Sequence, residues 1–332
     1  MAHSVRTLLA FALSAIVYCA ASFAQQTSGS VPTRVSPSQS AALTEVVALL
    51  DSWRGDPAVL HSARLKLDHI LRSSPGVAEA HREYARYHIM SGYISGNKVA
   101  PASLAAAERS LNEALRLNPK YAEAYVLAGH LYFLRDELPQ AMDALAKARA
   151  IGTSDPWLPL NTADIMIAQG RLDEAASNYE TVIASGTTNR KAMLAAFSGL
   201  IRYYERTGQT QNADRTHQKQ IAYEPDSAWL HGNYAAFLLC TKDDFETAIV
   251  RFRIALNQMN YGMARSGLAA ALYRKWASGS RLGESADSSA LFNEAQRLRT
   301  GTPAEVVTSF CRGGPAVAAV VRAASRAPAT AR

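Results

Sequence analysis

The stretch YVLAGHLYFLRDELPQAMDALAKA, residues 125–148, decides the fold. Apolar side chains recur in it at intervals of three and four residues, as in Ala141, Leu145 and Ala148, and this is the spacing of one face of an α-helix. The polar run RDELPQ separates two such helices. The same helical spacing continues along the chain from Ser36, and no run of alternating β-branched residues appears. The sequence therefore predicts an all-α protein.

The helix pair repeats. A small residue stands near the start of the second helix at Ala107, Ala141 and Ala175, which are 34 residues apart, and again at Ala213 and Ala248 after 38 and 35 residues. Four residues after this position comes a large apolar side chain at Leu67, Leu111, Leu145, Tyr179 and Phe252. Three residues later comes another small or apolar one at Ala114, Ala148, Val182 and Ala255. A fixed period in this range indicates a repeat protein.

These positions resemble the tetratricopeptide repeat (TPR), whose two helices carry the same small, large and small residues. The best match is Tyr125, Ala128, Gly129, Tyr132, Ala141, Leu145 and Ala148, and the segments GRLDEAASNYETVI (170–183) and DDFETAIVRFRIAL (243–256) also match closely. The resemblance covers roughly residues 42–300, in six or seven repeats. It implies a TPR protein of the exported bacterial type, folded as a right-handed α-solenoid of stacked antiparallel helix pairs.

One helix pair cannot bury its apolar face alone, so neighbouring pairs must stack. We therefore expect one array over residues 38–302, although a length of 332 by itself suggests two domains. A flexible linker is expected over 25–37, an inserted loop over 92–102, and a partly disordered segment or capping helix over 303–332. Three residues depart from the repeat pattern and indicate a looser or polar-lined stretch near 190–225: Ile201, His217 and Gln220.

The first 24 residues have the features of a cleaved signal peptide. Arg6 precedes the short apolar run LLAFALSAIVY (8–18), and small residues lead up to Ala24. We expect cleavage after Ala24, a periplasmic or secreted protein, and no stable membrane insertion afterwards. The alternative of a membrane anchor needs a longer apolar run of about 20 residues. A lipid anchor at Cys19 is disfavoured by the bulky Tyr18 before it.

The charge of the chain narrows the class of partner, and its cysteines raise the question of a disulfide. The net charge is +7, but no dense basic cluster is present, so nucleic acid is not expected as a partner. Two cysteines, Cys240 and Cys311, remain after signal cleavage. An oxidising compartment would allow them to pair, and the alternative is two buried small apolar side chains. The sequence does not decide between the two.

No catalytic or metal-binding motif is present. The sequence lacks a Gly-rich phosphate loop and the H-E-x-x-H, C-x-x-C and G-x-S-x-G patterns. His81 and His88 are seven residues apart, or about 10 Å along a helix, which is too far to share one small ion. We therefore predict a non-catalytic protein without metal or cofactor.

The resemblance implies a concave groove, lined by the first helices, that binds an extended peptide or a partner helix. Aromatic and Arg side chains predominate among binding hot spots. Asn side chains can form hydrogen bonds with the backbone amides of a ligand. Trp157 and Trp229 alternatively pack against the turns that precede their helices. The candidate groove residues are Arg82, Arg86, His130, Phe133, Trp157, Asn161, Arg202, Trp229, Asn233 and Tyr273.

The leading hypothesis is an exported protein–protein interaction scaffold with a role in envelope assembly or secretion, and with another, unidentified protein as partner. The alternative is a repeat protein that binds glycan or peptidoglycan fragments or regulates an enzyme. An enzyme built from residues without a recognisable motif is a third hypothesis.

Overall fold

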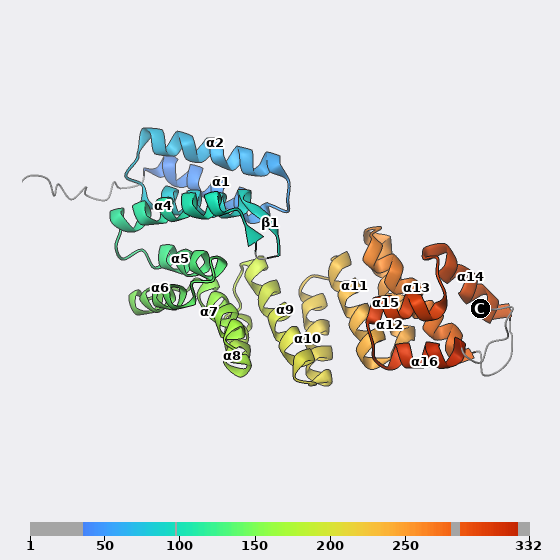
Figure 1. Ribbon diagram of the computed structural model, residues 1–332. Helices are drawn as coiled ribbons and strands as arrows, with labels where there is room; N and C mark the ends of the chain where they lie inside the picture. Colours follow the sequence, from blue (N-terminus) through green and yellow to red (C-terminus); the bar gives the residue numbers. More distant parts are fainter. Residues whose placement is uncertain (1–35, 97, 280–285, 325–332) are drawn as a thin grey trace, which may run out of the picture. The chain divides into compact units, whose positions relative to one another are not determined.

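The computed structural model describes residues 36–96, 98–279 and 286–324, and the chain divides into two compact units, Met1–Thr153 and Ser154–Arg332 (Figure 1). The predicted signal peptide and all but the last two residues of the predicted linker lie outside the described residues. Helices joined by short turns make up nearly all of the described residues in both units, which confirms the all-α prediction.

The first unit holds three helix pairs and a small hairpin. Its packing is divided between two apolar clusters, one among α1, α2 and α3 and one among α3, α4, α5 and α6. The elements are α1 (Pro37–Ser52), α2 (Pro57–Ser73), α3 (Ala78–Ser91), β1 (Tyr93–Ser95), β2 (Lys98–Val99), α4 (Pro101–Leu117), α5 (Ala122–Leu134) and α6 (Leu138–Ile151).

The second unit continues the pairing and ends in two short helices. One apolar cluster lies among α7, α8 and α9, and a larger one extends from α10 to α16. The elements are α7 (Trp157–Ala168), α8 (Leu172–Ala184), α9 (Arg190–Arg206), α10 (Thr210–Tyr223), α11 (Ala228–Phe237), η1 (Leu238–Lys242), α12 (Phe245–Gln258), α13 (Gly262–Gly279), α14 (Ala286–Leu298), α15 (Pro303–Cys311) and α16 (Pro315–Ala324). Of these, η1 is a single turn of π-helix.

The repeat register is confirmed by burial. The small residues that begin the second helices are fully buried, and so are nearly all of the large side chains four residues later. Gly129 shows why small residues are needed, because a Cβ atom there would lie 2.5 Å from Cδ2 of Leu145. Packing at this density leaves no room for a side chain.

In four helix pairs, from α5–α6 to α11–α12, the turn between the two helices has the same conformation. Asp136, Gly170, Gly208 and Asp243 all have a left-handed backbone, with φ between 60° and 77°. They are separated by 34, 38 and 35 residues, which is the period of the alanines. A left-handed residue is a common way to end a helix. The backbone conformation of these turns therefore follows the repeat, although the turn residue is Asp in two pairs and Gly in the other two.

The predicted inserted loop 92–102 contains a short antiparallel hairpin, which the sequence analysis did not expect. Tyr93 pairs with Val99, and the amide of Ala100 donates to the carbonyl of Gly92 at 2.8 Å. Gly96 supplies the turn with a φ of +54°. Cross-strand pairing of an aromatic with a β-branched residue stabilises such a ribbon. Its outer side chains, Tyr93 and Ile94, are exposed.

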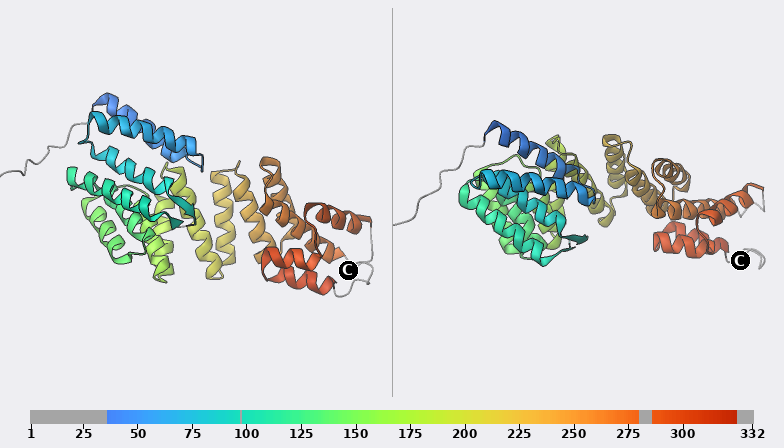
Figure 2. Two further views of the ribbon diagram at one scale, coloured as in Figure 1. Left: turned by 45° about the horizontal axis from the view of Figure 1, so that its top comes forward. Right: turned by 90° about the horizontal axis from the view of Figure 1, so that it is seen from above.

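Two short helices, α15 and α16, pack on α13 at the C-terminal side of the second unit (Figure 1 and Figure 2). Val306, Val307 and Val320 are buried in the same cluster as α13. A disulfide joins Cys240 in η1 to Cys311 at the end of α15, which answers the question that the sequence left open. The segment after residue 302 is thus helical over most of its described part.

Candidate functional site

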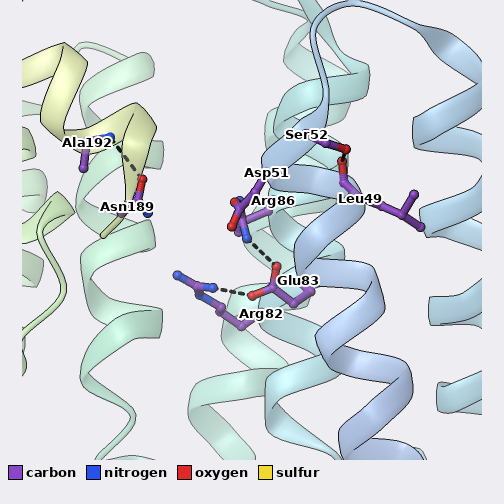
Figure 3. A network of polar contacts seen from close by, with 8 residues as sticks. All are labelled: Leu49, Asp51, Ser52, Arg82, Glu83, Arg86, Asn189 and Ala192. Atoms are coloured by element: carbon purple, nitrogen blue, oxygen red, sulfur yellow. Dashed lines mark hydrogen bonds and ion pairs between the residues drawn. The ribbon is translucent and has the colours of Figure 1, made fainter. Parts of the chain in front are cut away.

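In the first unit, the two arginines of the predicted groove are engaged in an internal ion-pair network. Both guanidinium groups contact the carboxylate of Glu83, which is 4% exposed, and Arg86 also reaches Asp51 at 2.5 Å (Figure 3). Helix spacing explains the contact between Arg86 and Glu83, because residues three apart share a face. Removing one member of such a buried group leaves charge without compensation. The network therefore has a structural role, and these arginines are not free cations on a groove.

His130 and Phe133 lie on α5 and are both half-buried. Nδ1 of His130 is buried without a hydrogen-bond partner. Burial lowers the pKa of His130 from 6.5 to about 4, because the charged imidazolium would lose its hydration. His130 is therefore neutral near pH 7, and its contribution to binding would be that of a neutral ring.

In the second unit, α7 and α9 present a different arrangement. Asn161 is only 5% exposed and Trp157 is half-buried, so both belong mainly to the packing of α7. Arg202 on α9 is exposed. Burial is the main cause that raises the pKa of Asp164, while the positive charge of Arg202 opposes the rise. Of these predicted residues, Arg202 is the most accessible.

Helix α11 is the first helix of the following pair. It carries the most accessible aromatic residue among the predicted groove residues. Trp229 is 53% exposed and its ring lies 4.4 Å from that of Tyr261, centroid to centroid. Tyr261 is itself held by a hydrogen bond from its hydroxyl to the carbonyl of Ala228, at 3.1 Å. Asn233, one turn further along α11, is also exposed. Trp229 is thus fixed against a partner ring while much of its surface remains open.

Tyr273 requires a correction. It is fully buried in α13, where its ring packs edge-on against Phe292 and its hydroxyl donates to the carbonyl of Gly301 at 3.4 Å. The prediction that it faces a ligand is wrong. The reason is that α14 and the segment after it cover α13, so the register of the earlier first helices does not apply to its surface.

A cleft that the sequence did not predict lies in the second unit, between α10, α11 and α12. Its volume is about 590 Å³, within the range of pockets that hold small ligands. The departures at His217 and Gln220 lie in the same helix, α10, but neither residue lines the cleft. Its lining residues are Asp214, Gln218, Ile221, Ala222, Pro225, Tyr234, Leu238, Lys242, Asp244, Thr247 and Arg251.

In the part of the chain that the structure describes, no group of three or more His, Cys, Asp or Glu side chains is placed to hold a metal ion. Within the same residues, no helix combines the length and the apolar character that a membrane span requires.

Stacked antiparallel helix pairs, with small residues at the contacts and left-handed turns between the helices, define a helical-repeat protein of the solenoid class. The pairs have the fold of the tetratricopeptide repeat, which confirms the predicted fold class.

Comparisons with known structures agree. The chain is similar to the Cut9–Hcn1 hetero-tetramer of the APC/C, with 16% identity, a TM-score of 0.53, and coverage of 70% of this chain and 46% of that chain. It is also similar to IFIT1 with m7Gppp-AAAA, with 13% identity, a TM-score of 0.52, and coverage of 81% and 62%. A third similar structure is a thermophilic TPR protein of Thermus thermophilus, with 18% identity, a TM-score of 0.49, and coverage of 60% and 98%.

Comparisons of sequence give less. No protein-family profile matches the chain. A stretch of 64 residues is 36% identical to an uncharacterized protein of Haemophilus influenzae, and it spans 19% of this chain and 35% of that protein. The chain thus spans about a third of that relative, and less than two thirds of the Cut9–Hcn1 and IFIT1 chains.

Proposed function

We propose that this chain is an exported, non-catalytic scaffold that binds another protein through the first helices of its repeats, in envelope assembly or secretion. The observation that carries the proposal is Trp229, which is 53% exposed and whose ring packs against that of Tyr261. An aromatic residue held in place contributes contact area at little cost in conformational entropy, and such residues dominate binding hot spots. Asn233 and Arg202, exposed on α11 and α9, add polar contacts.

Export is supported by two observations. The N-terminal sequence has the pattern of a cleaved signal peptide. Cys240 and Cys311 form a disulfide, and disulfides persist mainly in oxidising compartments. Mass spectrometry of the mature protein should find Gln25 at its N-terminus. Intact Met1 on a membrane-bound protein would contradict export.

The binding test compares variants in capture from an envelope extract. Trp229→Ala and Asn233→Ala should each weaken retention of the partner about tenfold or more, equivalent to about 1.4 kcal/mol. Arg149→Ala, an exposed change on the second helix α6, should leave retention within a few fold. A partner that tolerates Trp229→Ala but is lost in Arg149→Ala would contradict binding through the first helices.

Glycan binding is the second candidate function, and the same exposed indole supports it, since sugars stack on aromatic faces. Peptidoglycan fragments should then quench the fluorescence of Trp229 without any protein being retained from the extract.

A further inference from the structure

The cleft is lined by residues of α10, α11, η1 and α12, and α10 and α12 are the second helices of their pairs. Its accessible apolar lining comes from Ile221, Ala222 and Pro225, while Leu238 and Tyr234 behind them are buried. Polar and charged groups surround this lining. The cleft therefore combines an apolar surface with a small number of oriented charges, as ligand sites do.

Most of these charges are already satisfied inside the protein. Asp214 forms an ion pair with Lys242 at 2.8 Å and accepts a hydrogen bond from the hydroxyl of Tyr234 at 2.7 Å. The carboxylate of Asp244 caps α12 by accepting from the amide of Thr247 at 3.1 Å. None of these groups needs a charged ligand to balance its own charge.

Arg251 differs from them. Its guanidinium carbon lies 5.5 Å from the centre of the Tyr234 ring, and Nη1 is 3.5 Å from Nδ1 of His231. Neither neighbour is a carboxylate. Among the described residues, Arg251 makes no ion pair with a carboxylate, whereas Arg253, two residues later on α12, is paired with Glu294 at 2.9 Å.

His231 fixes the direction of Arg251. Nε2 of His231 is 2.9 Å from the carbonyl oxygen of Pro225, and a carbonyl can only accept, so Nε2 carries the proton. In the neutral ring, Nδ1 then offers its lone pair to the N–H of Arg251. His231 contacts one edge of the Arg251 guanidinium, and the Tyr234 ring contacts one of its faces. The remaining N–H donors of Arg251 are available to a ligand.

We infer that this cleft binds a peptide segment of a partner protein that presents one carboxylate to Arg251 and an apolar side chain to Ile221 and Ala222. A carboxylate fits because Arg presents two parallel donors to it. A doubly charged phosphate would fit less well, because Asp214 and Asp244 also line the cleft. The inference rests on the proposed function only in taking the occupant to be a protein.

The test uses the purified chain and two matched pools of five-residue peptides, blocked at both ends, with Glu or Gln at the centre and apolar residues around it. Isothermal titration should show the Glu pool binding at least about tenfold more tightly than the Gln pool, a difference of about 1.4 kcal/mol. Arg251→Gln should remove that preference. Arg251→Lys should keep part of it, because the charge remains and the paired donors are lost.

Arg253→Gln is the matched control, since it removes a charge from the same helix outside the cleft lining, and it should keep the Glu preference within about twofold. Equal binding of both pools, no charge-dependent binding up to millimolar peptide, or unchanged binding in Arg251→Gln with an unchanged melting temperature would each overturn the inference. Binding of hexanoate as tightly as the Glu pool would overturn it in favour of a small-molecule site.

The two proposals fail separately. Trp229→Ala should leave the Glu preference intact, because Trp229 is not among the lining residues. Loss of partner capture in Trp229→Ala, with no effect of Arg251→Gln on the peptides, would leave the proposed function standing and overturn only this inference.

Discussion

Helices α6 and α10 occupy the same place in their repeats but carry different residues. The three repeat positions are Ala141, Leu145 and Ala148 in α6, and Ala213, His217 and Gln220 in α10. His217 and Gln220 are nevertheless 4% and 3% exposed. The stack of helices thus determines which positions are buried, whatever residue stands there.

The two polar residues of α10 differ in whether hydrogen bonds compensate for their burial. Nε2 of Gln220 donates to Oγ of Ser198 at 2.9 Å, and this bond compensates for lost hydration. His217 packs beside the rings of Tyr234 and Phe237, and neither of its ring nitrogens has a hydrogen-bond partner, although Nε2 lies 3.7 Å from Oε1 of Glu205. A buried group without a partner costs about 1–3 kcal/mol. Four predictions test whether α6 stabilises its pair more than α10 does.

The largest effect is expected from Leu145→Ala. Leu145 is almost fully buried and abuts Gly129, so truncation leaves a cavity. The free energy of unfolding should fall by about 2–5 kcal/mol, measured by urea denaturation. Leu65→Ala, an exposed leucine on α2, should change it by less than about 0.5 kcal/mol. Equal effects of the two changes would show that the α6 register is wrong.

Gly129→Leu should also destabilise the pair, through overpacking. A Cβ at this position would lie 2.5 Å from Cδ2 of Leu145 and 3.3 Å from the carbonyl oxygen of Ala141. We expect a loss of about 1–3 kcal/mol or more, and a lower melting temperature. Gly55→Leu tests a glycine with a left-handed backbone and no close contacts, so its loss should come from backbone strain alone. An unchanged melting temperature for Gly129→Leu would exclude this close contact.

His130 makes the α5–α6 pair sensitive to acid. Its pKa is about 4 in the folded protein and about 6.5 when unfolded, so between these pH values only the unfolded chain takes up the proton. Stability should therefore fall as the pH is lowered from about 6.5 to about 4, and His130 makes no contribution to the change above that range. The loss should be about 1–2 kcal/mol, with partial screening taken into account.

Denaturation at pH 7 and pH 4.5 checks this. His130→Gln stays neutral at both values, so it should show a smaller difference between them than the unmodified chain. The same difference in both proteins would rule out His130 as the acid-sensitive group.

The smallest effect, of opposite sign, is expected in α10. His217→Leu replaces a buried ring without hydrogen bonds by an apolar side chain and should stabilise the protein by about 1 kcal/mol at pH 8. Gln220→Leu is the comparison, because it breaks the bond to Ser198 and should not stabilise. If His217→Leu lowered the melting temperature as much as Gln220→Leu, the His217 site would not be the weaker point.

The contrast also shows what the sequence can predict. Spacing alone placed Ala141, Leu145 and Gly129 correctly, because the close packing of two helices restricts residue size at fixed intervals. The ion-pair network around Glu83 was not predicted, since it depends on Asp51, which lies on a different helix 35 residues before Arg86. Tyr273 was misplaced because its neighbours come from α14 and the following loop, outside the repeat.

The cleft beside Arg251 was missed for a related reason. Its features depend on three helices meeting and on the tautomer of His231, and neither appears in a pattern of small and large residues. The irregular residues of the 190–225 stretch pointed to the right region without identifying the residues that matter.

The disulfide has a consequence for how the chain comes apart. In a stack whose repeats contact only their neighbours, unfolding starts at an end and moves inward one helix at a time. Cys240 and Cys311 are 71 residues apart, and the covalent link closes a loop that contains α12, α13 and α14. Fraying can release α16, but α15 stays tethered to η1, so it cannot diffuse away from the stack. Unfolding from the C-terminal side therefore has to open this looped block as one cooperative step.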